Sequence, residues 1–185
     1  DPGNRACVIA VNGVACGINI CADVWEPGAA DAAHAAGAQL LLALNASPYH
    51  MNKQVRRYEV LRSRIADTNL PVVYDNLVGG QDELVFDGAS FALDARGDLV
   101  YQASSFEESL DIIEFADSDL QRGGIAAAQP LEADVYAALT PRVRDSLGKS
   151  GFPGAIIGLS GGVDSALTLA IAVDALGAGN VTAVR

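Results

Sequence analysis

The chain has 185 residues, half of them hydrophobic, which suffices for one ordinary domain or for one domain and part of another. Its net charge of −11, from 12 basic and 23 acidic side chains, disfavours nucleic acid and anionic membranes as partners and favours small polar substrates. No apolar run approaches the roughly 20 residues that span a bilayer. Three cysteines and no recognisable signal peptide favour a reducing compartment, by default the cytoplasm.

Seven apolar runs predict strands in the first part of the chain, and several are continuous enough to be buried on both faces. They cover residues 6–11, 14–20, 40–45, 71–78, 90–94, 99–103 and 111–116. Helices are predicted at 27–37, which starts at a proline and ends at a glycine, and at 53–68, which carries an apolar stripe. This order predicts an α/β layered fold that ends in a β meander.

Residues 117–131 lose the apolar periodicity and gain Gly, Asp and Gln, so a linker is predicted between domains at 1–116 and 132–185. The helical pattern that follows contains Pro141, which should kink or divide it. A short strand, a polar turn, an apolar helix ending at Gly177 and another strand follow. Because the chain begins with Asp1 and stops just after a new strand, we expect a piece of a larger enzyme.

A glycine-serine turn lies between strand and helix patterns in IIGLSGGVDSALTLA, residues 156–170. Converging backbone N–H groups and a helix N-terminus suit such a turn to phosphate. Asp164 would repel phosphate unless a divalent cation lay between them, which predicts Mg²⁺ bound by Asp164. The lysine of a Walker A loop is missing, and a simple N-cap would need only one polar residue. The predicted ATP-binding residues are Gly158, Leu159, Ser160, Gly161, Gly162, Val163, Asp164 and Ser165.

Cys21 is the candidate nucleophile, because it follows a predicted strand and precedes a polar turn and a helix. That position is the carboxyl edge of a sheet, where α/β folds carry their chemistry. A thiol there can attack an amide and divide its hydrolysis into two easier steps. Cys7 and Cys16 are interpreted as inert hydrophobic side chains.

Two motifs resemble known families. ICADVWEPG resembles the nucleophile motif of nitrilase-type amidases, and LLLALNASPYHMNK, PVVYDNLVGGQDELVFDGAS and LDARGDLVY continue that likeness through residue 116. SGGVDS resembles the pyrophosphate loop of ATP pyrophosphatases. In this order the two motifs resemble the glutamine-dependent NAD⁺ synthetase family, over essentially the whole chain. The resemblance implies the C-terminal part of a nitrilase-type αββα sandwich, then the start of a Rossmann-like parallel α/β domain.

The resemblance also implies a reaction and its residues. Cys21 would release ammonia from glutamine, and Ser47 and Lys53 would hold that glutamine. ATP with Mg²⁺ would adenylate deamido-NAD⁺, and ammonia would displace AMP to give NAD⁺. The family channels ammonia and forms homo-oligomers. For Ser47 and Lys53, a loop cap and a solvated first-turn residue are the alternatives.

The chain departs from the family pattern in two respects. Ala22 stands where the family usually has an acidic residue, which would weaken a contact behind the nucleophile. The family's catalytic Glu and Lys lie upstream of the segment matched by Asp1, and Cys21 would be slow without them. Two other functions stay open: another glutamine-dependent ATP-pyrophosphatase amidotransferase, and a non-catalytic nitrilase-like oligomerisation module.

The remaining polar and aromatic residues allow only general expectations. His34 and His50 are isolated from other ligand types, so neither is expected in a metal site. Trp25 is interpreted as core or pocket wall. The polar segment 81–83 is equally compatible with a pocket lining and with a solvated turn.

Overall fold

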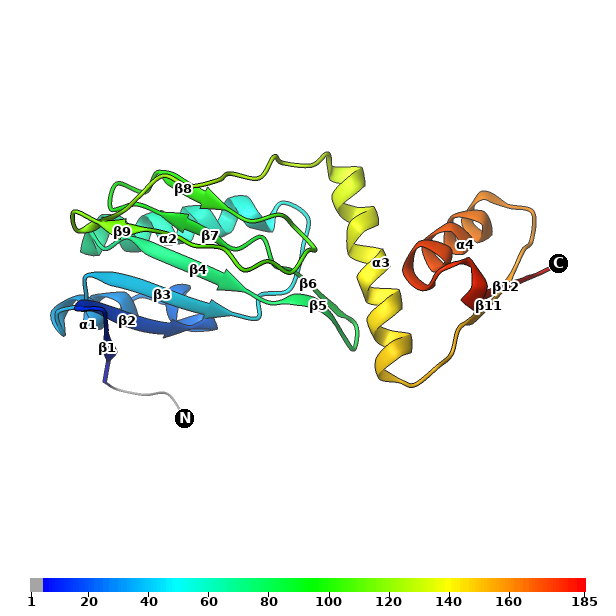
Figure 1. The fold of residues 1–185 in the computed structure, drawn as a ribbon, viewed down its shortest axis with the longest axis horizontal. Helices are drawn as coiled ribbons and strands as arrows, with labels where there is room; N and C mark the ends of the chain where they lie inside the picture. Colours follow the sequence, from blue (N-terminus) through cyan, green and yellow to red (C-terminus); the bar gives the residue numbers. More distant parts are fainter. Residues whose placement is uncertain (1–4) are drawn as a thin grey trace.

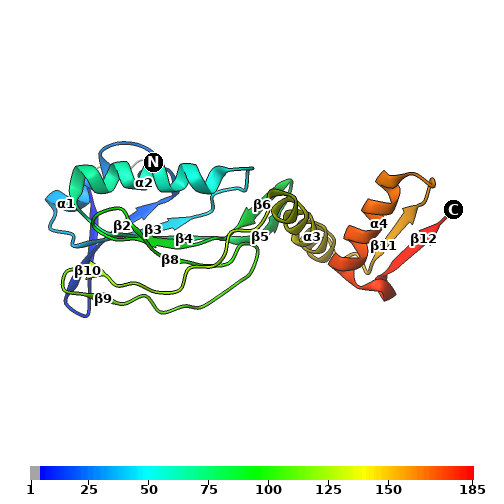
Figure 2. The same ribbon diagram turned by 90° about the horizontal axis from the view of Figure 1, so that it is seen from above.

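The computed structural model describes residues 5–185 and shows a layered α/β unit joined through one long helix to a smaller βαβ unit (Figures 1 and 2). The beginning of the first predicted domain, residues 1–4, lies outside the described residues. Along the described chain, no helix combines the length and apolar character needed to cross a membrane. The predicted α/β layered architecture is confirmed.

The main sheet has six strands in the order β1-β2-β3-β4-β7-β8. These strands are β1 (Cys7–Val11), β2 (Val14–Ile20), β3 (Leu40–Asn45), β4 (Val72–Asn76), β7 (Phe91–Leu93) and β8 (Leu99–Gln102). The central strands β2, β3 and β4 are parallel, with Ile20 opposite Leu44 and Leu44 opposite Asp75. Their carboxyl ends therefore meet at one edge of the sheet.

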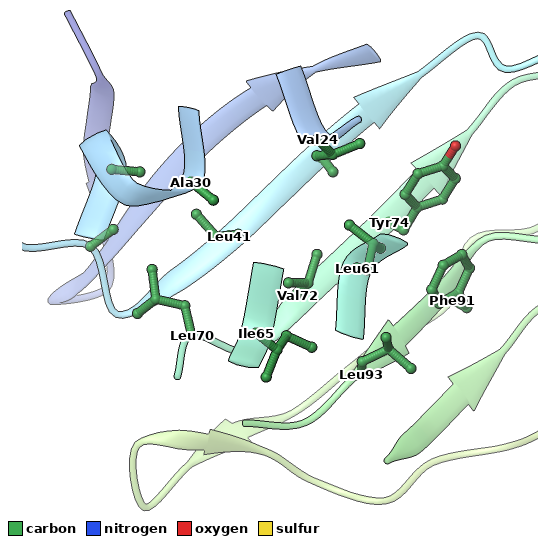
Figure 3. Packing of buried hydrophobic residues seen from close by; sticks show 13 residues of the cluster. Val24, Ala30, Leu41, Leu61, Ile65, Leu70, Val72, Tyr74, Phe91 and Leu93 are labelled. Carbon is green, nitrogen blue, oxygen red and sulfur yellow. The ribbon is translucent and has the colours of Figure 1, made fainter. Parts of the chain in front are cut away.

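Helices α1 (Ala29–Ala35) and α2 (Lys53–Thr68) cover one face of this sheet (Figure 2). The apolar stripe of α2 supplies Leu61 and Ile65 to the larger core cluster, in which Val72 and Phe91 of the sheet are fully buried (Figure 3). Gly17 permits the close packing of β2 on α1, because a Cβ there would lie 2.8 Å from the Cβ of Ala33. Packing of the two helices on the sheet therefore fixes the position of the edge at which the carboxyl ends of β2, β3 and β4 meet.

Two of the predicted strands differ in the structure. The run 71–78 divides at Leu77 into β4 and β5 (Val78–Gln81), and β5 forms a hairpin with β6 (Leu84–Asp87) outside the main sheet. The run 111–116 is a strand only at β9 (Phe115–Ala116), which pairs with β10 (Asp119–Leu120). The prediction for 111–114 is wrong, because those residues have no pairing partner in the sheet and Ile112 is 96% exposed.

The segment predicted as a linker begins as part of the layered unit. The Gly123 N–H donates to the Val100 carbonyl at 2.8 Å, and the Ala126 N–H donates to the Gln102 carbonyl at 3.0 Å. These bonds hold the extended chain beside β8 before it reaches α3 (Leu131–Lys149). The linker boundaries at 117 and 131 stay a prediction.

The second unit contains β11 (Ala155–Gly158), α4 (Val163–Leu176), a short 3-10 helix η2 (Ala178–Asn180) and β12 (Val181–Val184). Strands β11 and β12 are parallel, so α4 is the crossover helix between them. Helix α3 packs against α4 and also against the β5–β6 hairpin. Helix α3 runs unbroken through Pro141, supported by packing on two sides, so the predicted division is wrong, and the alternative of a kink stays a prediction.

The hairpin turn at 81–83 is exposed but makes polar contacts with α3. Asp145 accepts the Gly80 N–H at 2.7 Å, and Lys149 donates to the Gln81 side-chain oxygen at 3.2 Å. Arg142 donates to the Glu83 carbonyl. The predicted polar segment is therefore the tip of a hairpin that rests on α3.

Candidate active site

Cys21 lies at the carboxyl end of β2, where it begins a short 3-10 turn, η1 (Cys21–Val24). Its φ of 47° is in the left-handed region, which is uncommon for a residue with a side chain. Asp23 stabilises the turn by accepting the Ile20 N–H at 2.7 Å. The turn leaves the Cys21 side chain half-buried, and strain of this kind is typical of functional positions.

The other two cysteines have different surroundings. Cys16 is buried in the second core cluster and burial raises the pKa of its thiol, whereas Cys7 is exposed on the edge strand β1. Ala22 is exposed, and its carbonyl accepts the Trp25 N–H at 2.9 Å. The Ala22 main chain thus takes part in the turn, and its side chain points to no bonded partner in the described structure.

Ser47 follows β3 and lies beside the end of β4. Its N–H donates to the Asn76 side-chain oxygen at 2.8 Å, and its carbonyl accepts from Arg57 at 2.9 Å. The Ser47 hydroxyl is buried without a hydrogen-bond partner, as is the Tyr74 hydroxyl (Figure 3 shows Tyr74). Burial raises the pKa of Tyr74, while the nearby Ser47 hydroxyl, although not at regular hydrogen-bond geometry, and the positive charge of Arg57 lower it. Ser47 makes no capping bond in the described structure, so the loop-cap alternative has no support.

Lys53 begins α2 and is half-buried. Its Nζ lies 5.8 Å from the centre of the Trp25 ring. Burial lowers the pKa of Lys53, and the positive charge of Arg57 adds to that effect, whereas Asp87 and Cys21 oppose it. Lys53 is therefore partly buried and lies within electrostatic reach of Cys21, unlike a fully solvated first-turn residue.

A cavity of about 430 Å³ opens beside this lysine. Its wall is formed by Trp25, His50, Met51, Asn52, Lys53 and Arg56. Trp25 thus contributes to a pocket wall, one of its two predicted roles. Lys53 and Arg56 supply two cationic groups that suit a carboxylate, but neither Cys21 nor Ser47 lines this cavity.

The sequence interpretation missed a buried ion pair behind Ser47. Arg57 donates to both carboxylate oxygens of Asp87, at 2.7 and 2.8 Å, and its side chain is completely buried. A pattern that could have revealed it is the spacing 57, 61 and 65, which places Arg57 on the buried stripe of α2 with Leu61 and Ile65. A charged residue on such a stripe indicates a buried partner.

The glycine-serine turn connects β11 to α4. Gly161 has φ +85°, which favours glycine, and a Cβ at Gly158 or Gly161 would meet no atom within 4 Å. Ser165 accepts the Ser160 N–H at 3.3 Å and donates to the Gly162 carbonyl at 3.0 Å. The two serines thus shape the turn and leave an open face beside its backbone.

Asp164 lies exposed in the first turn of α4. Within residues 5–185, no group of three or more His, Cys, Asp or Glu side chains is arranged to hold a metal ion. One carboxylate at an open phosphate-type turn nevertheless fits Mg²⁺, which takes its remaining ligands from water and substrate phosphates. The turn and the Cys21 region lie on opposite sides of α3 (Figures 1 and 2).

Comparison with known proteins assigns the class. Residues 1–126 match the carbon-nitrogen hydrolase family, and the chain belongs to that family. Residues 135–185 match the NAD synthase family. Over its whole length the chain is 42% identical to the glutamine-dependent NAD(+) synthetases of Rhodobacter capsulatus and Acinetobacter baylyi. It covers 34% of each of these relatives, so it spans about a third of their length.

Two solved structures are similar in fold to the parts of this chain that they cover. A glutamine-dependent NAD⁺ synthetase from Acinetobacter baumannii, in complex with ADP, aligns over 99% of this chain and 35% of its own, with TM-score 0.92 and 41% identity. A nitrilase-superfamily amidase from Nesterenkonia aligns over 56% of this chain and 38% of its own, with TM-score 0.50 and 25% identity. The predicted family resemblance and the predicted succession of a nitrilase-type fold and the start of a synthetase fold are confirmed.

Proposed function

We propose that the chain is part of an enzyme that amidates deamido-NAD⁺ to NAD⁺ with ATP, using ammonia that its amidase site releases from glutamine. The observation that carries the proposal is the presence in one chain of a strained cysteine turn at a sheet edge and an open glycine-serine turn before a helix. The relatives that match the whole chain are named glutamine-dependent NAD(+) synthetases, which supports it.

At the amidase site, Cys21 attacks the side-chain amide carbon of glutamine. Ammonia leaves, a thioester forms at Sγ, and water then hydrolyses it to glutamate and the free thiol. The unpartnered hydroxyl of Ser47 and the ammonium group of Lys53 bind the charged end of glutamine. The family resemblance assigns the general base and the cationic partner to a Glu and a Lys upstream of Asp1. A related Nesterenkonia amidase is described with an adduct on its active-site cysteine, which supports this chemistry.

At the glycine-serine turn, the backbone of residues 158–165 holds the β- and γ-phosphates of ATP. A carboxylate oxygen of deamido-NAD⁺ attacks the α-phosphorus and pyrophosphate leaves. Ammonia then attacks the activated carbonyl carbon, and AMP leaves. Mg²⁺, held by Asp164, would neutralise phosphate charge. The ADP complex of the Acinetobacter baumannii relative supports a nucleotide in this family.

The proposal also covers the domain boundaries, location, oligomeric state and partners of the enzyme. We infer domains at 1–116 and 132–185 joined by a linker at 117–131, a cytoplasmic homo-oligomer, and no nucleic-acid or membrane partner. The acidic composition supports the last inference.

The test uses the full-length protein with ATP, Mg²⁺ and deamido-NAD⁺. Wild type should form NAD⁺ with glutamine or with ammonium, while Cys21→Ala should use ammonium alone. Cys7→Ala is the matched control, because Cys7 is an exposed cysteine of strand β1, paired with Ile18 and outside the Cys21 turn, and it should retain both activities. Glutamine-dependent synthesis by Cys21→Ala would contradict the amidase assignment. Amidation of a different acceptor in place of deamido-NAD⁺ would contradict the synthetase assignment.

A further inference from the structure

Four polar groups converge behind the carboxyl ends of β3 and β4. Arg57 comes from α2, Asp87 from the end of β6, Asn76 from the end of β4, and Ser47 from the loop after β3. Each is at most 5% exposed. Such a dense polar cluster in the interior needs a reason, because burying charge is costly unless every group is well paired.

The cluster holds the main chain of Ser47 from both sides. Asn76 accepts the Ser47 N–H at 2.8 Å, and Arg57 donates to the Ser47 carbonyl at 2.9 Å through Nη2. Asn76 also donates to the Ser47 carbonyl at 3.4 Å. Both polar groups of this peptide segment are thus fixed by side chains and not by the sheet.

Asp87 in turn fixes the two side chains that hold Ser47. It accepts Nη1 and Nη2 of Arg57 at 2.7 and 2.8 Å, and it accepts the Asn76 side-chain N–H at 3.3 Å. Because Arg57 Nη2 contacts Asp87 and Ser47 together, only a planar fork of donors can satisfy both partners. The ion pair therefore orients the donor that binds the Ser47 carbonyl.

The side chain of Ser47 is the one polar part of this residue that the cluster leaves free. Its hydroxyl is buried and makes no hydrogen bond to Arg57, Asp87 or Asn76; the one side chain that it acts on is Tyr74, whose pKa it lowers, and no regular hydrogen bond joins the two hydroxyls in the described structure. A fixed backbone with a free buried hydroxyl is the arrangement expected of a preorganised ligand contact, in which the surrounding groups lock the geometry of the group that binds.

We propose that Arg57, Asp87 and Asn76 are positioning residues that fix the Ser47 main chain so that its hydroxyl meets the amino-acid end of glutamine. The inference deepens the proposed function and rests on it. None of the three residues touches the substrate. Their effect is to lower the cost of ordering the binding loop when glutamine arrives.

The test uses the full-length protein and the variant Arg57→Lys. A lysine keeps the positive charge beside Asp87 but lacks the fork that reaches Ser47 as well. The KM for glutamine should rise roughly tenfold or more, the usual effect of losing a charged hydrogen bond, while kcat falls less. NAD⁺ synthesis from ammonium should stay within twofold of wild type.

The matched control is Arg62→Lys on the same helix. Arg62 donates to the Gly97 carbonyl at 2.9 Å and lies over the Tyr58 ring, away from the cluster. The same chemical change there should leave the KM for glutamine within twofold. A second readout is alkylation of Cys21: in Arg57→Lys, labelling by a glutamine-analogue diazoketone should need roughly tenfold more reagent to saturate, while iodoacetamide should react as in wild type.

The variant Asn76→Ala covers the case in which Arg57→Lys fails to fold, which would be seen as loss of ammonium-dependent activity too. It removes the Asn76 contacts to Ser47 and one 3.3 Å hydrogen bond to Asp87, keeps the Arg57–Asp87 ion pair, and should raise the KM for glutamine in the same way. If wild type uses glutamine and both variants keep a KM within twofold of it, the positioning role is wrong. If wild type does not use glutamine at all, the proposed function itself is wrong.

Discussion

The two candidate sites of this chain are built in opposite ways. Around Ser47, the polar groups are buried and fixed by side chains from four separate segments. The turn at 158–165 is exposed or half-buried throughout, and its shape comes from its own glycines and serines. The first site therefore depends on the whole tertiary structure, whereas the second depends mainly on a few neighbouring residues.

The largest expected difference concerns stability. Asp87→Ala removes one partner of a fully buried ion pair and leaves Arg57 unpaired, so it should lower the free energy of unfolding by about 3–5 kcal/mol. Asp164→Ala changes an exposed carboxylate and should alter it by at most about 0.5 kcal/mol. Urea denaturation of the full-length protein measures both. If the two substitutions lowered the free energy of unfolding equally, the Ser47 region would depend on tertiary packing no more than the glycine-serine turn does.

A substitution at Asp164 should separate the ATP-dependent reaction from glutamine hydrolysis. Asp164→Asn keeps the shape of the side chain but removes the charge proposed to hold Mg²⁺, so AMP formation should fall by roughly 100-fold, as when one electrostatic contact is lost from a reaction site. Glutamine hydrolysis, followed as glutamate released, should be spared. An unchanged rate of AMP formation would remove Asp164 from the metal site.

The third prediction compares two glycines. Gly17→Ala would place a Cβ 2.8 Å from that of Ala33, and this overpacking should cost about 1–3 kcal/mol of stability. Gly161 has open space but φ +85°, so Gly161→Ala should cost about 1–2 kcal/mol through backbone strain alone. Nucleotide titration gives the sharper contrast: only Gly161→Ala should weaken ATP binding. If Gly17→Ala also weakened ATP binding, the glycine-serine turn would depend on the packing of the layered unit.

The smallest expected effect is a pH dependence of the layered unit. Burial, with a further contribution from Asp111, raises the pKa of Tyr101 to about 12. In the unfolded chain a tyrosine ionises near pH ~10, so the folded state binds more protons between these values. The stabilisation from Tyr101 is therefore complete below about pH 10 and is lost as the pH rises through about 12.

An ultraviolet absorbance titration of tyrosinate in wild type and in Tyr101→Phe checks this. Because burial also raises the pKa of Tyr49, Tyr58 and Tyr74, wild type should show one more late-titrating tyrosine than the variant does. If the absorbance change missing from the variant falls near pH ~10 in wild type and not at a higher pH, Tyr101 is not protected by its surroundings.

The elements found from the sequence are those whose pattern is local. β2, β3 and α2 were predicted because their apolar runs or stripes are uninterrupted, and Cys21 and the turn at Gly161 were found because each lies in a short motif. These features depend on residues that are neighbours in the chain.

The features that were missed depend on contacts between distant residues. The β5–β6 hairpin contains Gly79 and Gly80, which are typical of a loop, and its position reflects the bond from Gly80 to Asp145 in α3. Arg57 and Asp87 are 30 residues apart, and nothing near Asp87 in the sequence indicates a buried partner. The buried stripe of α2 marks Arg57 as a residue that needs a partner, but the identity of that partner is fixed by tertiary packing.

The central claim is that nitrogen passes from glutamine at Cys21 to the product made at the glycine-serine turn. The most direct measurement follows glutamine labelled with ¹⁵N in its side-chain amide through the full-length enzyme, with unlabelled ammonium present in the buffer. The account predicts that wild type places ¹⁵N in the carboxamide of NAD⁺ and that Cys21→Ala places only unlabelled nitrogen there. Incorporation of ¹⁵N by Cys21→Ala would contradict it.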